Sequence, residues 1–246
     1  MTNRLGLSLA LAVALLSVPG AFAQKAGAQE PKALKKKITK VVRCDYLLYL
    51  PADYGRDSST RWPVLLFLHG SGERGSDLQK VKVHGPPKLI GQGKEMPFIV
   101  VSPQCPENES WSSEVLGTLL DEVEKKYRVD KDREYVTGLS MGGFGTWDLT
   151  MAFPTRFAAI APICGGGTPR RAGRIRNVPA WIFHGGKDPT VPVKESQDMY
   201  DALKAAGDPD VKLTIYPDPQ HDSWTETYNN PELYTWLLSH SRAERK

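Results

Sequence analysis

A serine between two glycines lies where a strand-like segment of this 246-residue chain meets a helix-like one. The motif Gly138-x-Ser140-x-Gly142 follows the β-type run at residues 135–139 and precedes a helical pattern at residues 142–153. G-x-S-x-G is common by itself, but between a strand and a helix it is typical of a sharp turn that lifts the serine hydroxyl above a parallel sheet. Glycines suit this turn because side chains there would clash with the neighbouring strand and helix. The motif therefore predicts a parallel sheet with a nucleophilic serine at its edge.

The remaining segments alternate between strand and helix. Residues 114–127 and 194–206 have apolar side chains at helical spacing, and a last helix begins at Asn230 with Pro231 in its first turn. Alternation of this kind predicts an α/β fold, with a mostly parallel sheet covered by helices on both faces. The short connection at residues 164–179 leaves no room for a large cap domain. The expected strands are residues 41–50, 64–69, 98–102, 135–139, 157–163, 180–184 and 212–216.

Composition is that of an ordinary globular protein, with 40% hydrophobic and 24% charged residues. The length suits one domain of the larger α/β kind, whose core can form without metals or disulfides. Part of the net charge of +4 lies in the lysine-rich residues 32–40. We interpret that stretch as a solvated surface and expect no nucleic-acid partner.

The N-terminal residues have the pattern of an export signal. A short basic region (1–4) precedes an uncharged apolar run (5–18) and an A-x-A site that ends at Ala23. We expect a signal peptide at residues 1–23, a flexible lead-in at 24–37 and a catalytic domain at 38–246. Cleavage would leave a secreted or periplasmic protein without stable membrane insertion; an uncleaved anchor is the alternative.

Three cysteines, Cys44, Cys105 and Cys164, are present, so that at most one internal pair can form. Each lies in or just after an apolar strand-like run, and none has the Cys-x-x-Cys spacing of a metal or redox site. We interpret them as small buried thiols. One internal disulfide is the alternative, because export would place the protein in an oxidising compartment.

A serine nucleophile needs a neighbouring base, and the base needs a carboxylate that holds its tautomer. Of the five histidines, only His184, His221 and His240 follow Ser140. After a turn of this kind the acid precedes the histidine in the chain. His221 fits this order because it follows the last expected strand. His184 comes before the acid candidate, and His240 lies near the end of the last helix, where a cation is favourable.

The candidate acids are Asp188, Asp218 and Asp222. Asp188 comes soon after the expected strand 180–184, and the carboxyl ends of strands are where such sheets bind ligands. Asp218 and Asp222 are close to His221 in sequence, but short loops seldom fold a side chain back onto a neighbouring imidazole. Asp188 is therefore the predicted acid, with a turn-forming aspartate before a proline as the alternative.

Acyl transfer also needs donors for the developing oxyanion. One predicted donor is the backbone N–H of Met141, directly after the nucleophile. The second comes from the small-residue loop after strand 64–69, where Ser71 is our first choice and Gly70 our second.

Three further side chains are candidates for substrate contacts. Trp111 and Trp224 lie on loops expected near the serine and could form an aromatic wall. Arg74 could face a polar substrate, but a bracing ion pair with Glu73 is the favoured interpretation.

Four segments carry a family resemblance: LFLHGSGERG (66–75), TGLSMGG (137–143), HGGKDPTVP (184–192) and QHDSW (220–224). The chain resembles the α/β-hydrolase superfamily over residues 41–238, specifically the exported esterases of the polyhydroxybutyrate-depolymerase-like, feruloyl-esterase-like and phospholipase/carboxylesterase-like group. The resemblance implies an eight-stranded sheet, a Ser140–Asp188–His221 triad and carboxylic-ester hydrolysis without a metal or other cofactor. The expected substrates are short-chain esters or acyl and feruloyl groups on polysaccharide.

Two other functions are compatible with the same pattern. Prolyl-oligopeptidase-like peptidases share the domain and the order of the triad, and a non-catalytic binding module could use the same fold. The sequence leaves the oligomeric state open.

Overall fold

The computed structural model describes residues 29, 31–218 and 220–244. The predicted signal peptide (residues 1–23) lies outside the described residues. Residues 24–28 and 30 of the predicted lead-in also lie outside them. Residues 31–40 are exposed and contain no helix or strand, and the chain divides into two units at residue 41. Within the described residues, none of the helices has the length and apolar character needed to span a bilayer.

In the described part of the chain, seven strands form one sheet in the order β1-β3-β2-β4-β5-β6-β7. β1 runs antiparallel to β3, and every other neighbouring pair is parallel. The predicted α/β fold with a mostly parallel sheet is therefore confirmed. The strands are β1 (Tyr46–Tyr49), β2 (Trp62–Leu68), β3 (Ile99–Pro103), β4 (Val129–Leu139), β5 (Ala159–Ile163), β6 (Ala180–Gly185) and β7 (Val211–Tyr216).

The resemblance implied an eight-stranded sheet, but the sheet formed by the described residues has seven strands. The expected strand at residues 41–50 is reduced to β1, because the chain before Tyr46 has no partner strand among the described residues. Val41 is 90% exposed, which fits an extended segment leading to the sheet rather than a member of it.

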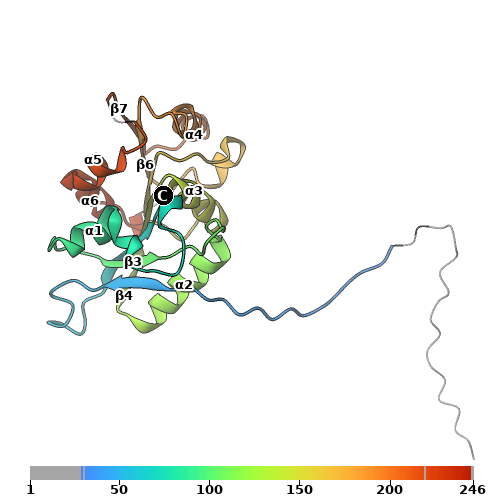
Figure 1. Cartoon of the computed structure of the whole chain (residues 1–246). Coiled ribbons are helices and arrows are strands. Elements are labelled where there is room, and N and C mark those ends of the chain that lie inside the picture. Colours follow the sequence, from blue (N-terminus) through green and yellow to red (C-terminus); the bar gives the residue numbers. More distant parts are fainter. Residues whose placement is uncertain (1–28, 30, 219, 245–246) are drawn as a thin grey trace, which may run out of the picture. The chain divides into compact units, whose positions relative to one another are not determined.

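Two layers of helices cover the sheet (Figure 1). Successive strand residues point to opposite faces: Leu66 packs in one core with the first layer, while Phe67 packs in the other core with the second. The first layer consists of α2 (Ser113–Lys126), α3 (Met141–Ala152) and α4 (Lys194–Ala205), and the second of α1 (Gly85–Gly91), α5 (Trp224–Asn229) and α6 (Pro231–Leu238).

Three helices (α2, α3 and α4) match the sequence prediction within one residue at each end, and α6 begins at Pro231 as predicted. The helices α1 and α5 were not predicted. Each of these two has only six or seven residues, too few for an apolar periodicity to stand out. In α1 the prolines Pro86 and Pro87 lie in the first turn, where the missing N–H groups cost no helical hydrogen bond.

The strand order creates a crevice at the carboxyl edge of the sheet. β2 lies between β3 and β4; the chain continues from β2 to β3 on one side and from β4 to β5 on the other. Loops that leave two adjacent strands in opposite directions open a binding site between them. Gly70 and Ser140 follow these two strands, so the topology places them at this position.

Two glycines allow α3 to approach the sheet closely. A Cβ atom on Gly142 would lie 1.9 Å from the carbonyl oxygen of Leu68 at the end of β2. A Cβ on Gly138 would lie 2.3 Å from the carbonyl oxygen of Gly142. Both obstacles are backbone atoms, which cannot rotate away as a side chain can.

This packing gives a prediction for Gly142→Ala. The substitution should lower the free energy of unfolding by about 1–3 kcal/mol, because the added methyl forces α3 away from β2. Gly173→Ala is the matched control, since a Cβ there meets nothing within 4 Å; its effect should stay within about 0.5 kcal/mol. Denaturant unfolding of both variants tests the idea, and equal stabilities would contradict it.

Candidate active site

Ser140 lies in a strained turn between β4 and α3. Its backbone angles are φ 52° and ψ −117°, outside the regions that a side-chain-bearing residue normally adopts. Surrounding hydrogen bonds hold this conformation. The Ser140 N–H donates to the carbonyl of Ile163 at 3.0 Å, and the Ser140 carbonyl accepts from the N–H of Phe144 at 3.1 Å. The strain exposes the hydroxyl at the end of the sheet, as the sequence motif predicts.

The structure brings Ser140, His221 and Asp188 together in one hydrogen-bonded chain. The Oγ of Ser140 lies 2.9 Å from Nε2 of His221, and Nδ1 of His221 lies 2.7 Å from Oδ2 of Asp188. Asp188 follows β6, and His221 lies on the loop between β7 and α5. This arrangement can raise the nucleophilicity of the hydroxyl, because the imidazole can take its proton while the carboxylate balances the resulting charge.

The Asp188 carboxylate is buried, with no exposed side-chain surface, and remains ionised. Burial by itself raises the pKa of this carboxyl. Hydrogen bonds from His221 and from the backbone N–H groups of Val191 and Thr190 outweigh that effect and hold the pKa below its usual value. Asp188 therefore presents a negative charge to the imidazole at neutral pH.

Two other buried histidines hold the site in shape, a role that the sequence analysis did not assign. His184 lies 2.9 Å from the Val191 carbonyl through Nε2, which also lies 3.3 Å from Oδ2 of Asp188. His69 accepts from the N–H of Cys105 through Nε2, so its Nδ1 donates to the Gly70 carbonyl at 2.6 Å. Burial lowers the pKa of His69 to about 4, which keeps this imidazole neutral. The only sequence signal for these roles is that each histidine closes or directly follows a strand.

The predicted oxyanion loop lies beside the nucleophile. Gly70 is followed by the 3₁₀ helix η1 (Ser71–Glu73), and a Cβ on Gly70 would lie 3.7 Å from Cβ of Ser140. Met141 is the first residue of α3 and Ser71 the first of η1. Their N–H groups have no acceptor within their own helices, as at any helix start. Both are thus available as the predicted oxyanion donors, and the assignment remains a prediction.

A cleft of about 370 Å³ opens next to Ser140. The predicted Trp111 is on its wall, held by a hydrogen bond from Nε1 to the carbonyl of His69 at 3.1 Å. Phe144 and Asp148 also line the cleft but were not predicted. The sequence pattern that could have identified them is their spacing of three and seven residues from Met141, which places all three residues on one helical face.

Trp224 lies near His221 but not in this cleft. Its ring packs edge-on against the His221 imidazole, with centroids 5.2 Å apart, and its Nε1 donates to Nδ1 of His84 at 3.2 Å. Trp224 lines a different pocket. Trp111 and Trp224 thus line separate hollows rather than one continuous wall, and their contact with a substrate stays a prediction.

The favoured ion pair between Arg74 and Glu73 is absent from the described residues. The Arg74 guanidinium instead contacts Sδ of Met141 at 2.9 Å, beside the cleft. The Glu73 carboxylate lies 4.0 Å from Nδ1 of His69 and 3.8 Å from Nε2 of His84. The pair fails because η1 ends between these adjacent residues and their side chains diverge.

All three cysteines are free, so the structure contains no disulfide between them. Sγ of Cys164 accepts from the Ser140 N–H at 3.3 Å and lies within 4.8 Å of ligand atoms of Asp188 and His221. Burial raises the pKa of the Cys164 thiol to about 12, so it stays protonated and is a poor metal ligand. Asp188 and His221 are already bonded to each other. This cluster fits a hydrogen-bonded triad better than a metal site.

The sequence of this chain matches one protein family and several named relatives. The profile of the phospholipase/carboxylesterase family matches residues 96–232, more than half of the chain. A bifunctional acetylxylan esterase/xylanase of Neocallimastix patriciarum is 26% identical over 78% of this chain, which spans 28% of that relative. A probable feruloyl esterase C of Aspergillus terreus is 24% identical over 73% of this chain and 67% of its own length.

Among solved structures, a thermostable esterase is 35% identical and superposes with a TM-score of 0.67, over 80% of this chain and 59% of its own. The feruloyl esterase module of Clostridium thermocellum, at 18% identity and a TM-score of 0.58, shares the fold.

The geometry predicts the effect of Asp188→Asn on the reactivity of Ser140. Loss of the carboxylate removes the group that orients His221, so labelling by a fluorophosphonate should slow by roughly 10³–10⁴-fold. Asp218→Asn is the matched control, because Asp218 is exposed and pairs with Lys187 instead. Labelling rates of the two variants and the wild type are the measurement. If labelling slows equally in both variants, Asp188 is not the acid that orients His221.

Proposed function

The chain belongs to the phospholipase/carboxylesterase family, and from this membership we propose that it is a serine carboxylic-ester hydrolase. The observation that carries the proposal is the hydrogen-bonded chain from Oγ of Ser140 through His221 to Asp188. The strained backbone of Ser140 adds support, because strain of this kind is found where a reactive group must be held in place.

The proposed reaction is a two-step acyl transfer. His221 takes the hydroxyl proton as Oγ of Ser140 attacks the ester carbonyl carbon, and the N–H groups of Met141 and Ser71 stabilise the oxyanion. The tetrahedral intermediate collapses, and His221 gives the proton to the leaving alcohol. A water molecule, deprotonated by His221, then attacks the acyl carbon. The bond between the acyl group and Oγ of Ser140 breaks, His221 returns the proton to Oγ, and the acid is released. Asp188 orients the imidazole and balances its charge throughout.

Short-chain acyl groups or feruloyl groups attached to polysaccharide are the proposed substrates. The names of two relatives, an acetylxylan esterase/xylanase and a probable feruloyl esterase, support this class. The cleft next to Ser140, at about 370 Å³, lies at the low end of the roughly 300–1,000 Å³ of ligand pockets, which favours a compact acyl group. Trp111 and Phe144 offer aromatic surface for the acyl group. Arg74 contacts Sδ of Met141, which lines the cleft, and is a proposed contact for a polar part of the substrate.

We also propose that the protein is exported. The apolar run at residues 5–18 and the A-x-A site ending at Ala23 support a cleaved signal peptide at residues 1–23. The catalytic domain would then act outside the cytoplasm, where polysaccharide substrates are accessible.

Ser140→Ala gives the direct test of the reaction. Turnover of p-nitrophenyl acetate should fall by roughly 10⁴–10⁶-fold, because the nucleophile of the first step is lost. Ser76→Ala, at an exposed position, controls for the general effect of removing a hydroxyl. Activity of Ser140→Ala near that of the wild type would exclude Ser140 from the mechanism.

A second measurement separates an esterase from a peptidase. An ester and an amide of the same acyl group should be compared on the wild-type enzyme. The proposal predicts hydrolysis of the ester at least roughly 10³-fold faster, because the alkoxide is a better leaving group than an amine and no peptide-selecting domain is in the described residues. A faster amide reaction would favour the prolyl-oligopeptidase-like alternative. Failure of a fluorophosphonate to label the folded protein would favour a binding module.

A further inference from the structure

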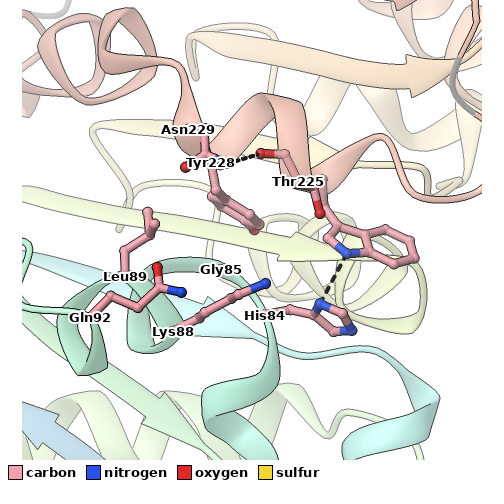
Figure 2. Close-up of a pocket in the computed structure, with 9 residues that line it drawn as sticks. His84, Gly85, Lys88, Leu89, Gln92, Thr225, Tyr228 and Asn229 are labelled. Atoms are coloured by element: carbon pink, nitrogen blue, oxygen red, sulfur yellow. Dashed lines mark hydrogen bonds between the residues drawn. The ribbon is translucent and has the colours of Figure 1, made fainter.

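A second pocket lies between α1 and α5 (Figure 2). Trp224 lines it, and the Trp224 ring also contacts the His221 imidazole. The volume of the pocket is about 150 Å³, which suits a single small ring rather than an extended ligand. We call it the α1–α5 pocket. Its polar lining comes from both helices and from the residues directly before and after α1: His84, Lys88, Gln92, Trp224, Thr225 and Asn229.

The lining of this pocket suits a hydroxyl-rich group. Its polar side chains carry one ammonium, two carboxamides, one imidazole, one indole and the hydroxyl of Thr225, and none of the lining residues is acidic. The Tyr228 hydroxyl is hydrogen-bonded to Thr137. The floor of the pocket is apolar, formed by Gly85, Leu89 and the ring of Tyr228. Polar donors around an aromatic and aliphatic floor match a sugar ring, which has hydroxyls at its edge and C–H groups on its faces.

Two of the polar side chains have no partner of their own. Within the described part of the chain, neither the Lys88 ammonium nor the Gln92 carboxamide takes part in a hydrogen bond or ion pair. Lys88 lies on α1 and Gln92 directly follows this helix, and Figure 2 shows both across the pocket from Thr225 and Asn229. The Asn229 amide donates to the carbonyl of Thr225 at 2.8 Å, which leaves its oxygen as an acceptor. Donors and an acceptor therefore converge on the same small space.

Trp224 connects this pocket to the catalytic histidine. Its ring lines the pocket and also packs edge-on against His221. The hydrogen bond from its Nε1 to Nδ1 of His84 fixes the ring in this position. A group in the pocket thus lies one aromatic ring away from the imidazole.

The position relative to His221 decides which half of an ester the pocket can accept. In the proposed mechanism His221 delivers a proton to the leaving alcohol, so the alcohol lies on the His221 side of the scissile bond. The cleft lined by Trp111, Met141 and Phe144 lies on the α3 side, next to the nucleophile, and suits the acyl half. The two hollows therefore correspond to the two halves of one substrate.

We propose that the α1–α5 pocket binds the saccharide that carries the ester, through Lys88, Gln92 and the ring of Trp224. This inference rests on the proposed function and deepens it, because it assigns the alcohol half of the substrate to a sugar and names its site.

The test uses two substrates that share an acetyl group and differ in their alcohol. An acetylated xylo-oligosaccharide and p-nitrophenyl acetate are compared on the full-length enzyme and on the double variant Lys88→Ala/Gln92→Ala. The ratio of kcat/KM for the oligosaccharide to that for the p-nitrophenyl ester should fall about tenfold in the variant. Lys82→Ala is the matched control, since Lys82 is exposed on the neighbouring 3₁₀ helix η2 (Lys80–Val83) and does not line the pocket.

A second measurement is independent of cleavage of the oligosaccharide. The de-esterified xylo-oligosaccharide should inhibit hydrolysis of p-nitrophenyl acetate, and the double variant should raise the inhibition constant by about the same factor of ten. An unchanged ratio together with unchanged inhibition overturns the inference. A wild type that cleaves the p-nitrophenyl ester but not the oligosaccharide also overturns it, while leaving the proposed ester hydrolase intact. A wild type inactive on both esters rejects the proposed function and this inference with it.

Discussion

The approach of α3 to the end of β2 is the constraint on which the rest of the site depends. Gly142 has no room for a side chain because the Leu68 carbonyl occupies that space, and Gly138 is limited in the same way by Gly142 itself. With both glycines in place, α3 starts directly above the sheet and Ser140 adopts its strained conformation. The same contact brings the loop after β2 against the nucleophile. The contact between α3 and the end of β2 thus fixes the positions of both Ser140 and the predicted oxyanion loop.

A second requirement is electrostatic. A buried carboxylate is unfavourable unless hydrogen bonds replace its lost hydration. Asp188 meets this requirement with two backbone N–H donors at one oxygen and His221 at the other. The resulting charge lies in a place that water does not reach, so its effect on the imidazole is weakly screened. His184 and His69 add hydrogen bonds around the same loops, which limits the positions that these loops can adopt.

The cleft next to Ser140 and the α1–α5 pocket have different linings, as the acyl half and the sugar half of one ester have different chemistry. The cleft beside Ser140 has aromatic walls from Trp111 and Phe144, whereas the α1–α5 pocket has a polar rim and a cation. Trp224 and His221 stand between them. Many hydrolases share one fold and one triad while they cleave different bonds, so specificity depends on such surroundings rather than on the triad. The second pocket is formed mainly by the short helices α1 and α5.

The sequence by itself determined the alternation of the strands with the four helices that it predicted, the turn at Ser140 and the choice of His221 and Asp188, because these depend on local patterns and on chain order. It also indicated the loop at Gly70, since small residues after a strand are visible in one segment. Only the tertiary structure decided where Arg74, Glu73 and Trp224 point, and it created the α1–α5 pocket from helices too short to show a periodic pattern. The reason is physical: the contacts of Trp224 with His84 and of Arg74 with Met141 join residues 140 and 67 positions apart. Such contacts depend on how the sheet aligns the loops, and no local stretch of sequence carries that information.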